Sequence, residues 1–132
     1  MLQPEILFDD DEPDILDLGT LLLREAGYSV TPAANSDIAV IFLEQGLTFR
    51  LLVTDIVLPG LLDGFALAHR ARLLLPRLKV IYATGFGSVA RVRSKGGAPY
   101  GQLLSKPWKS EALLDLVAAA LPQRAAAPAI LR

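Results

Sequence analysis

Apolar positions along the chain follow two periods in turn, one typical of strands and one typical of helices. Short apolar runs of strand length, bounded by glycine, proline or charged residues, recur through the chain. They occupy residues 5–9, 28–32, 51–55, 79–83 and 103–104. Between them, apolar residues spaced three or four apart predict amphipathic helices at residues 13–27, 35–46, 64–75 and 110–121. Residues 86–101 predict only a turn or two of helix, because glycines and a proline interrupt them.

Local signals mark where the predicted helices begin and end. Pro13 suits the first turn of a helix, where a backbone N–H is not needed, and Gly27 suits the position just after a helix. Asn35 or Ser36 can cap the second helix, and Ser110 can cap the last one. The residues that start and end helices and the spacing of the apolar residues therefore predict the same helices.

The order of these elements predicts the fold class. Strands that alternate with helices form a parallel sheet with helices on both faces, joined by right-handed crossovers. The chain is therefore expected to be a single α/β domain with a doubly wound sheet of five parallel strands and no internal repeat. In such sheets the binding crevice lies outside the carboxyl ends of the strands, so the chemistry is expected at that edge.

Composition narrows the classes of protein and site. A length of 132 residues fits one domain, and the lack of cysteine excludes disulfides, thiolate zinc sites and cysteine nucleophiles. Hydrophobic residues make up 52% of the chain, yet no apolar stretch reaches the roughly 18 residues of a membrane span. The first residues lack the pattern of a secretion signal, which predicts a cytoplasmic protein without membrane insertion. The net charge of -1 argues against direct binding of nucleic acid.

Polar residues collect where the predicted strands end. Asp10 and Asp11 follow the first strand, Asp55 ends the third, Thr84 follows the fourth and Lys106 follows the fifth. Parallel strands bring their carboxyl ends to one edge of a sheet, so these side chains are expected to lie together. Clustered carboxylates repel one another unless a divalent cation joins them, and Mg2+ prefers hard oxygen ligands while leaving positions for phosphate oxygens. The pattern predicts a Mg2+ site that acts on a phosphoryl group.

The predicted cluster can perform phosphoryl transfer. Beside a bound cation, Asp55 can act as a nucleophile and form an acyl phosphate. Such a transfer needs positioning and charge neutralisation, which Lys106 and the hydroxyl of Thr84 can supply to the phosphoryl oxygens. Taken alone, the acidic run of residues 9–12 is more often a solvated turn. Its coincidence with polar residues at three other strand ends favours the functional interpretation.

Four motifs resemble those of the receiver domain of two-component response regulators, the CheY-like family. They are ILFDDDEP at the first strand, TDIVLPG followed by DG after the third, YATG at the fourth and LLSKPW at the fifth. None is specific by itself, but their order and spacing together cover residues 5–121. The resemblance implies a flavodoxin-like fold with five strands, which the order of elements predicts independently.

The resemblance implies a role for each residue that handles the phosphoryl group. Asp55 would accept phosphate from the phosphohistidine of a histidine kinase or a histidine phosphotransfer protein. Thr84 would be the switch hydroxyl, and Lys106 would contact the phosphoryl group, aimed by a cis peptide bond to Pro107. Phosphorylation would then shift the domain between two surface states that a downstream protein distinguishes.

The same resemblance implies how Mg2+ would be held. Asp11 would be a direct ligand, Asp10 would act through water, and Asp55 would also belong to the metal site. The backbone carbonyl of Val57 would be a further ligand.

Four features depart from the usual pattern of the family. Asp9 stands at a position that is usually apolar, and is expected to be either a buried charge with a partner or an extra acid at the margin of the site. The loop VLPGLLDG is one residue longer than the commonest form, a variant associated with receivers of hybrid sensor kinases. Leu103 replaces the aromatic switch residue of many members, and the fourth helix is short. The acceptor chemistry is expected to be retained while the output mechanism differs.

The sequence thus predicts a receiver domain at residues 1–122 and an Ala/Pro-rich tail or linker at residues 123–132, with no separate output domain. The domain is expected to relay phosphate and not to be an enzyme, although it would catalyse its own phosphorylation and its slow dephosphorylation. The apolar side chains of Val57 and Phe86 predict that this dephosphorylation is slow. The domain would either stand alone or be a piece of a hybrid kinase, and a homodimer is left open.

Two alternatives belong to other functional classes. One is a protein-binding module with a receiver fold that works without phosphorylation. The other is a hydrolase that forms an aspartyl phosphate, but such enzymes usually carry a second acid two residues after the nucleophile, where this chain has Val57.

Overall fold

The computed structural model describes residues 5–85 and 88–122, and it confirms the predicted alternation of strands and helices. The strands are β1 (Ile6–Asp9), β2 (Val30–Ala33), β3 (Leu51–Asp55), β4 (Lys79–Thr84) and β5 (Gly101–Ser105). The helices are α1 (Pro13–Glu25), α2 (Ser36–Glu44), α3 (Gly64–Leu74), α4 (Val89–Ser94) and α5 (Ser110–Ala120). All strand pairs are parallel and the sheet order is β2-β1-β3-β4-β5, the flavodoxin-like order.

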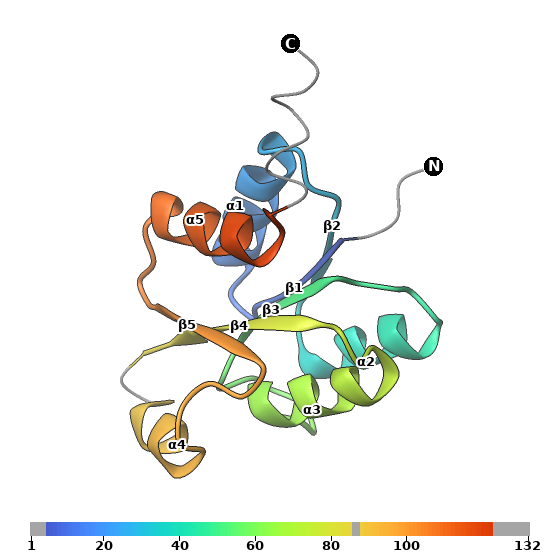
Figure 1. The fold of residues 1–132 in the computed structure, drawn as a ribbon, viewed down its shortest axis with the longest axis vertical. Coiled ribbons are helices and arrows are strands. Elements are labelled where there is room, and N and C mark those ends of the chain that lie inside the picture. The colour runs from blue at the N-terminus through green and yellow to red at the C-terminus, as the bar shows by residue number, and fades with distance from the viewer. Residues whose placement is uncertain (1–4, 86–87, 123–132) are drawn as a thin grey trace.

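The helices cover both faces of the sheet. Figure 1 shows α1 and α5 on one face and α2, α3 and α4 on the other. Because side chains alternate along a strand, Phe8 of β1 packs in the cluster that includes Leu113 of α5, whereas Leu7 packs in the cluster that includes Leu67 of α3. Asp9, two residues after Leu7, therefore lies on the α2 and α3 side of the sheet.

Most of the predicted helix ends are confirmed. Helix α1 begins at Pro13 and is followed by Gly27 at a φ of 100°. Asn35 caps α2, since its side chain accepts a hydrogen bond from the backbone N–H of Ile38. The prediction for Ser110 is wrong: it is the first residue of α5 and makes no side-chain cap.

The last strand is longer than the sequence predicts. It begins at Gly101, one of the glycines that interrupt the predicted fourth helix, and not at Leu103. A Cβ atom at position 101 would collide with the backbone of Val80 on the neighbouring strand, so only glycine allows this close approach. The predicted short fourth helix is confirmed as α4. Among the described residues, no helix combines the length and apolar character that crossing a membrane requires.

Candidate functional site

Three carboxylates meet at the carboxyl edge of the sheet. Asp10 and Asp11 follow β1, and Asp55 ends the neighbouring strand β3. One oxygen from each of the three lies within 4.8 Å of the others. Asp10 and Asp55 are only 3% and 6% exposed, whereas Asp11 is exposed. Hard oxygen donors gathered at this spacing, partly open to solvent, fit a divalent cation such as Mg2+.

The backbone around Asp10 fixes the orientation of its carboxylate. Its N–H donates to the carbonyl oxygen of Ala33, at 3.1 Å, which continues the pairing of β1 with β2. Its Oδ1 accepts a hydrogen bond from the N–H of Glu12 at 2.9 Å. The other oxygen, Oδ2, is thereby directed towards the centre of the site.

Lys106 brings a positive charge into this cluster from β5. Its Nζ lies 2.8 Å from Oδ1 and 3.0 Å from Oδ2 of Asp55, and 3.3 Å from Oδ2 of Asp10. A longer contact of 3.5 Å reaches Glu12, a partner that the sequence pattern did not indicate. The backbone N–H of Lys106 donates to the carbonyl of Thr84 at 2.7 Å, and the predicted cis peptide bond to Pro107 is present.

Burial and like charge work against ionisation of Asp55. Burial raises the pKa of Asp55, and the neighbouring Asp10 and Asp11 raise it further, while the ammonium of Lys106 opposes the shift. Burial alone would lower the pKa of Lys106, but the carboxylates of Asp55 and Asp10 more than compensate and raise it. Lys106 therefore remains a cation, and any additional positive charge at the site would favour the nucleophilic carboxylate form of Asp55.

Thr84 lies beside the acids but its hydroxyl is bonded elsewhere. Residue 83 pairs with Asp55, so Thr84 stands one position further along β4. Its Oγ1 lies 2.9 Å from Oγ of Ser88, which is only 3% exposed. Because Ser88 Oγ also donates to the carbonyl and accepts from the N–H of Gly85, its one proton is used and the Thr84 hydroxyl acts as the donor to it. Sequence reasoning missed Ser88, although a hydroxyl four residues after Thr84 was visible.

The DG motif after β3 has a structural reason. Asp63 caps α3 by accepting a hydrogen bond from the N–H of Ala66 at 2.8 Å. Gly64 donates its N–H to the carbonyl of Ile56 at 2.7 Å, and a Cβ atom at this position would collide with the carbonyl of Asp55. The start of α3 can therefore lie directly against the backbone that carries the candidate nucleophile.

Asp9 matches only half of the prediction made for it. It is buried, 1% exposed, but neither carboxylate oxygen has a hydrogen-bond partner among the described residues. Burial, followed by the charges of Asp10, Asp55 and Asp11, raises the pKa of Asp9 to about 8. The side chain is thus a neutral carboxylic acid at pH 7, and neither a paired charge nor an exposed ligand.

Two predicted contributors stay predictions. Val57 follows β3 by two residues and is 49% exposed. The predicted role of its backbone carbonyl as a Mg2+ ligand is not tested by these observations. Phe86 lies outside the described residues. The structure thus brings together Asp10, Asp11, Asp55 and Lys106, with Thr84 on the adjoining strand.

Comparison with known proteins agrees with this geometry. The family model described as "Response regulator receiver domain" matches residues 6–118. The response regulator receiver protein CpdR of Brucella abortus is 38% identical over 112 residues, which cover 85% of this chain and 89% of CpdR. The sensor kinase CckA of the same species is 30% identical over 114 residues, 85% of this chain but 12% of CckA.

A solved structure extends the similarity to the fold. The receiver protein of Sinorhizobium medicae superposes with a TM-score of 0.81 at 30% identity, covering 92% of this chain and 97% of that one. The resemblance recognised in the sequence motifs is confirmed. The chain therefore belongs to the response regulator receiver domains of two-component signalling, and its acidic cluster of Asp10, Asp11 and Asp55 is typical of their phosphoacceptor site.

Proposed function

We propose that this domain takes a phosphoryl group from the phosphohistidine of a histidine kinase or histidine phosphotransfer protein onto Asp55. The observation that supports Asp55 is its position: it is a buried carboxylate at the end of β3, within 3.0 Å of the Lys106 ammonium and beside two further acids. Receiver domains as a family interact with histidine kinases and with downstream effectors. We propose the kinase and the effector of this chain only as classes of protein.

The proposed transfer moves one phosphoryl group between two side chains. A carboxylate oxygen of Asp55 forms a bond to phosphorus as the bond from phosphorus to the donor's imidazole nitrogen breaks. The electron pair of that bond stays on the imidazole nitrogen, which takes up a proton. Lys106 is placed to pair with a phosphoryl oxygen, because its Nζ already contacts both oxygens of Asp55. The product is an acyl phosphate on Asp55 and a neutral histidine on the donor.

The proposed Mg2+ site consists of Asp10, Asp11, Asp55 and the backbone carbonyl of Val57, with Asp10 acting through water. Bound Mg2+ would supply positive charge that neutralises the phosphoryl oxygens and the clustered acids. The chain's own residues do the rest: Asp10 is oriented by the N–H of Glu12, and Lys106 by the carbonyl of Thr84.

The proposed switch is an exchange of one hydrogen bond. The proton of the Thr84 hydroxyl is donated to Ser88, so donation to a phosphoryl oxygen requires that Ser88 be released. Ser88 immediately precedes α4. Phosphorylation would in this way reach α4 without the aromatic residue that Leu103 replaces.

The proposal also includes the unit and its setting. We assign residues 1–122 to the receiver domain, because α5 ends at Ala120, and residues 123–132 to a tail or linker outside the described residues. We place the domain in the cytoplasm, and we assign it the role of a phosphoacceptor that catalyses its own phosphorylation and slow dephosphorylation.

Acetyl phosphate with Mg2+ tests the proposal by intact-protein mass spectrometry. We expect a gain of one phosphoryl group in the unaltered chain and in Asp17→Asn, an exposed acid of α1 outside the site. Asp55→Asn and the unaltered chain in EDTA should show no gain. Equal phosphorylation of Asp55→Asn and the unaltered chain would exclude Asp55 as the acceptor.

One observation favours the alternative of a binding module that works without phosphate. Asp9 places an unpartnered, buried acid beside the site, at a position that is usually apolar in the family, and the charge of Asp55 helps to raise the pKa of Asp9. If the protein gains no phosphoryl group from acetyl phosphate or from a phosphorylated kinase, yet binds its partner, this alternative holds. The hydrolase alternative requires turnover on phosphate esters, and the apolar Val57 two residues after Asp55 disfavours it.

A further inference from the structure

A concave site lies at the edge of the sheet opposite the acidic cluster. Its lining comes from residues 49–50 before β3, residues 75–79 from the end of α3 to the start of β4, and residues 120–122 at the end of α5. Its volume is about 690 Å³, within the range of pockets that hold small molecules. These residues stand at the amino ends of β3 and β4, and β3 alone separates them from Asp55 by about 13 Å, at 3.3 Å per residue.

Three cations line this cavity, which we call the basal pocket. They are Arg50, Arg77 and Lys79, and the lining contains no acidic residue. Arg50 forms a long ion pair with Glu5, with 3.5 Å between the guanidinium nitrogen and the carboxylate oxygen. Within residues 5–85 and 88–122, neither Arg77 nor Lys79 forms an ion pair. The pocket therefore concentrates positive charge in a chain whose net charge is -1.

The negative ends of neighbouring helices do not neutralise all of this positive charge. The carboxyl ends of α3 and α5 reach the pocket, and each carries roughly half a negative charge. Together with Glu5 they offset about two of the three positive charges. A net positive charge of about one remains, and an anion in the pocket would reduce the repulsion among the three cations.

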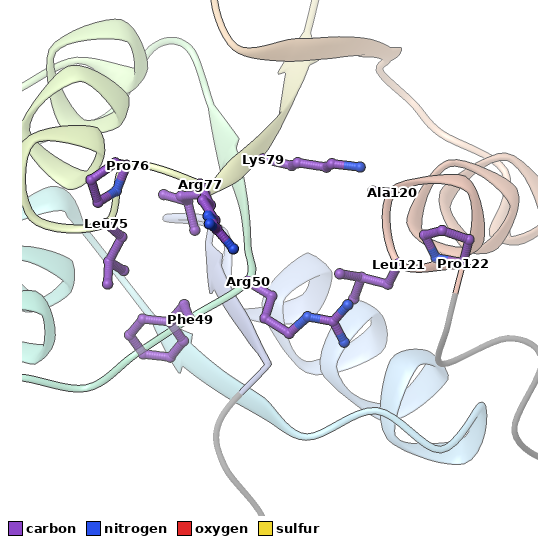
Figure 2. Close-up of a pocket in the computed structure, with 10 residues that line it drawn as sticks. Phe49, Arg50, Leu75, Pro76, Arg77, Lys79, Ala120, Leu121 and Pro122 are labelled. Carbon is purple, nitrogen blue, oxygen red and sulfur yellow. The ribbon is translucent and has the colours of Figure 1, made fainter.

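Apolar walls flank the cations. Figure 2 shows Phe49, Leu75 and Pro76 to one side of Arg77, and the side chains of Arg50 and Lys79 extending towards the end of α5. Two guanidinium groups and one ammonium group together offer hydrogen-bond donors for several oxygens of one anionic group, such as a phosphate. The walls then leave room for an apolar body on either side of that group.

We propose that the basal pocket binds a small organic phosphate, a phosphomonoester with an aromatic or aliphatic body. The phosphate contacts Arg50, Arg77 and Lys79, and the body packs on the apolar walls. This site is separate from the phosphoacceptor site and does not depend on phosphorylation of Asp55. Because it joins the start of β4 to the end of α5, its occupation stabilises the folded domain.

The probe for the test is 1-naphthyl phosphate, with inorganic phosphate and 1-naphthol as its two halves. The full 132-residue chain is titrated in EDTA and followed by 1H–15N NMR. We expect saturable shifts at the backbone amides of residues 50, 77–79 and 121, weaker binding of either half, and affinity that falls as salt is added. No saturable shifts at these amides up to about 10 mM, or shifts confined to the surroundings of Asp55 and Lys106, would overturn the proposal.

A pair of charge-matched variants makes the test specific. Arg77→Gln combined with Lys79→Gln removes two pocket cations at exposed positions and should weaken binding roughly tenfold or more. Arg93→Gln combined with Lys109→Gln removes two exposed cations outside the pocket and should leave the affinity unchanged. Equal affinity of the two variants would refute the basal pocket as the site. Inorganic phosphate binding as tightly as 1-naphthyl phosphate would refute the role of the apolar walls.

Discussion

Replacing Asp9 by valine should stabilise the fold, and increasingly so as the pH rises. Asp9 is a buried carboxyl group with two unpartnered oxygens on the face of β1 that packs against α2 and α3. Valine places an apolar side chain of similar size among apolar neighbours. The substitution therefore removes a polar group whose burial is not compensated by hydrogen bonds.

The size of the effect follows from the pKa of Asp9. Burial, then the charges of Asp10, Asp55 and Asp11, raises this pKa from 3.8 to about 8. In the unfolded chain the group is ionised above pH 4, but in the folded chain it keeps its proton up to about pH 8. The folded state therefore binds the extra proton, and its stability falls with rising pH in that window by up to about 1.4 kcal/mol per pH unit. At pH 7 the accumulated penalty is on the order of 4 kcal/mol, which is large against the 5–15 kcal/mol of a typical domain.

Urea unfolding in EDTA at pH 5, 6, 7 and 8 measures this effect. We expect the free energy of unfolding of Asp9→Val to exceed that of the unaltered chain by about 2–4 kcal/mol at pH 7, with a smaller difference at pH 5. Asp17→Ala removes one exposed acid and should stay within about 0.5 kcal/mol at every pH. Asp55 also has a raised pKa, but it is present in both chains, and repeating the comparison in an Asp55→Asn background removes its coupling to Asp9. A difference that does not change with pH would show that Asp9 is not a buried neutral acid.

Three further substitutions test the packing and the site. Lys106→Met removes the ammonium that contacts Asp55 and should slow phosphorylation by acetyl phosphate at least tenfold in mass spectrometry; an unchanged rate would contradict its role. Gly19→Ala should destabilise the domain by about 1–3 kcal/mol in urea despite alanine's better helix propensity, because a Cβ atom would collide with the Phe8 ring; a stabilised variant would contradict this packing. Ser88→Ala should speed hydrogen exchange in α4, and unchanged exchange there would contradict the link between Ser88 and that helix.

Local patterns were sufficient to predict the fold, because each strand and helix of this chain carries its own signal. The apolar runs and the caps lie within the elements they define, and the convergence of Asp10, Asp55 and Lys106 follows from parallel topology alone. The start of β5 was predicted wrongly because it depends on a contact between residues far apart in the sequence. Gly101 is a strand residue because of the Val80 backbone beside it, a contact between residues 21 positions apart that no local pattern contains.

Details of the site depended in the same way on tertiary contacts. A run of four acidic residues does not indicate which of them is buried, so the partnerless state of Asp9 could not be predicted. The bond between Thr84 and Ser88 depends on where the fold places Ser88 relative to the end of β4, and the presence of a serine four residues after Thr84 does not by itself indicate that the two side chains meet. The reach of Lys106 to Glu12 likewise depends on how β5 and the end of β1 lie across the edge of the sheet.

Helix α4 is short, so the free energy of one hydrogen bond can be large enough to move it. A hydrogen bond contributes about 0.5–1.5 kcal/mol net, so loss of the bond from Thr84 to Ser88 can shift only an element held by a similar amount. Helix α4 has six residues, and its Val92 is only partly buried against the core. An ion pair of 3.3 Å joins Arg91 to Asp63 with side chains 48% and 35% exposed, a kind of pair worth about 0–1 kcal/mol. Helix α5, in contrast, buries Leu113 completely, and truncating such a side chain costs about 2–5 kcal/mol. A phosphoryl group that competes for the Thr84 proton is therefore expected to move α4 and to leave α5 in place.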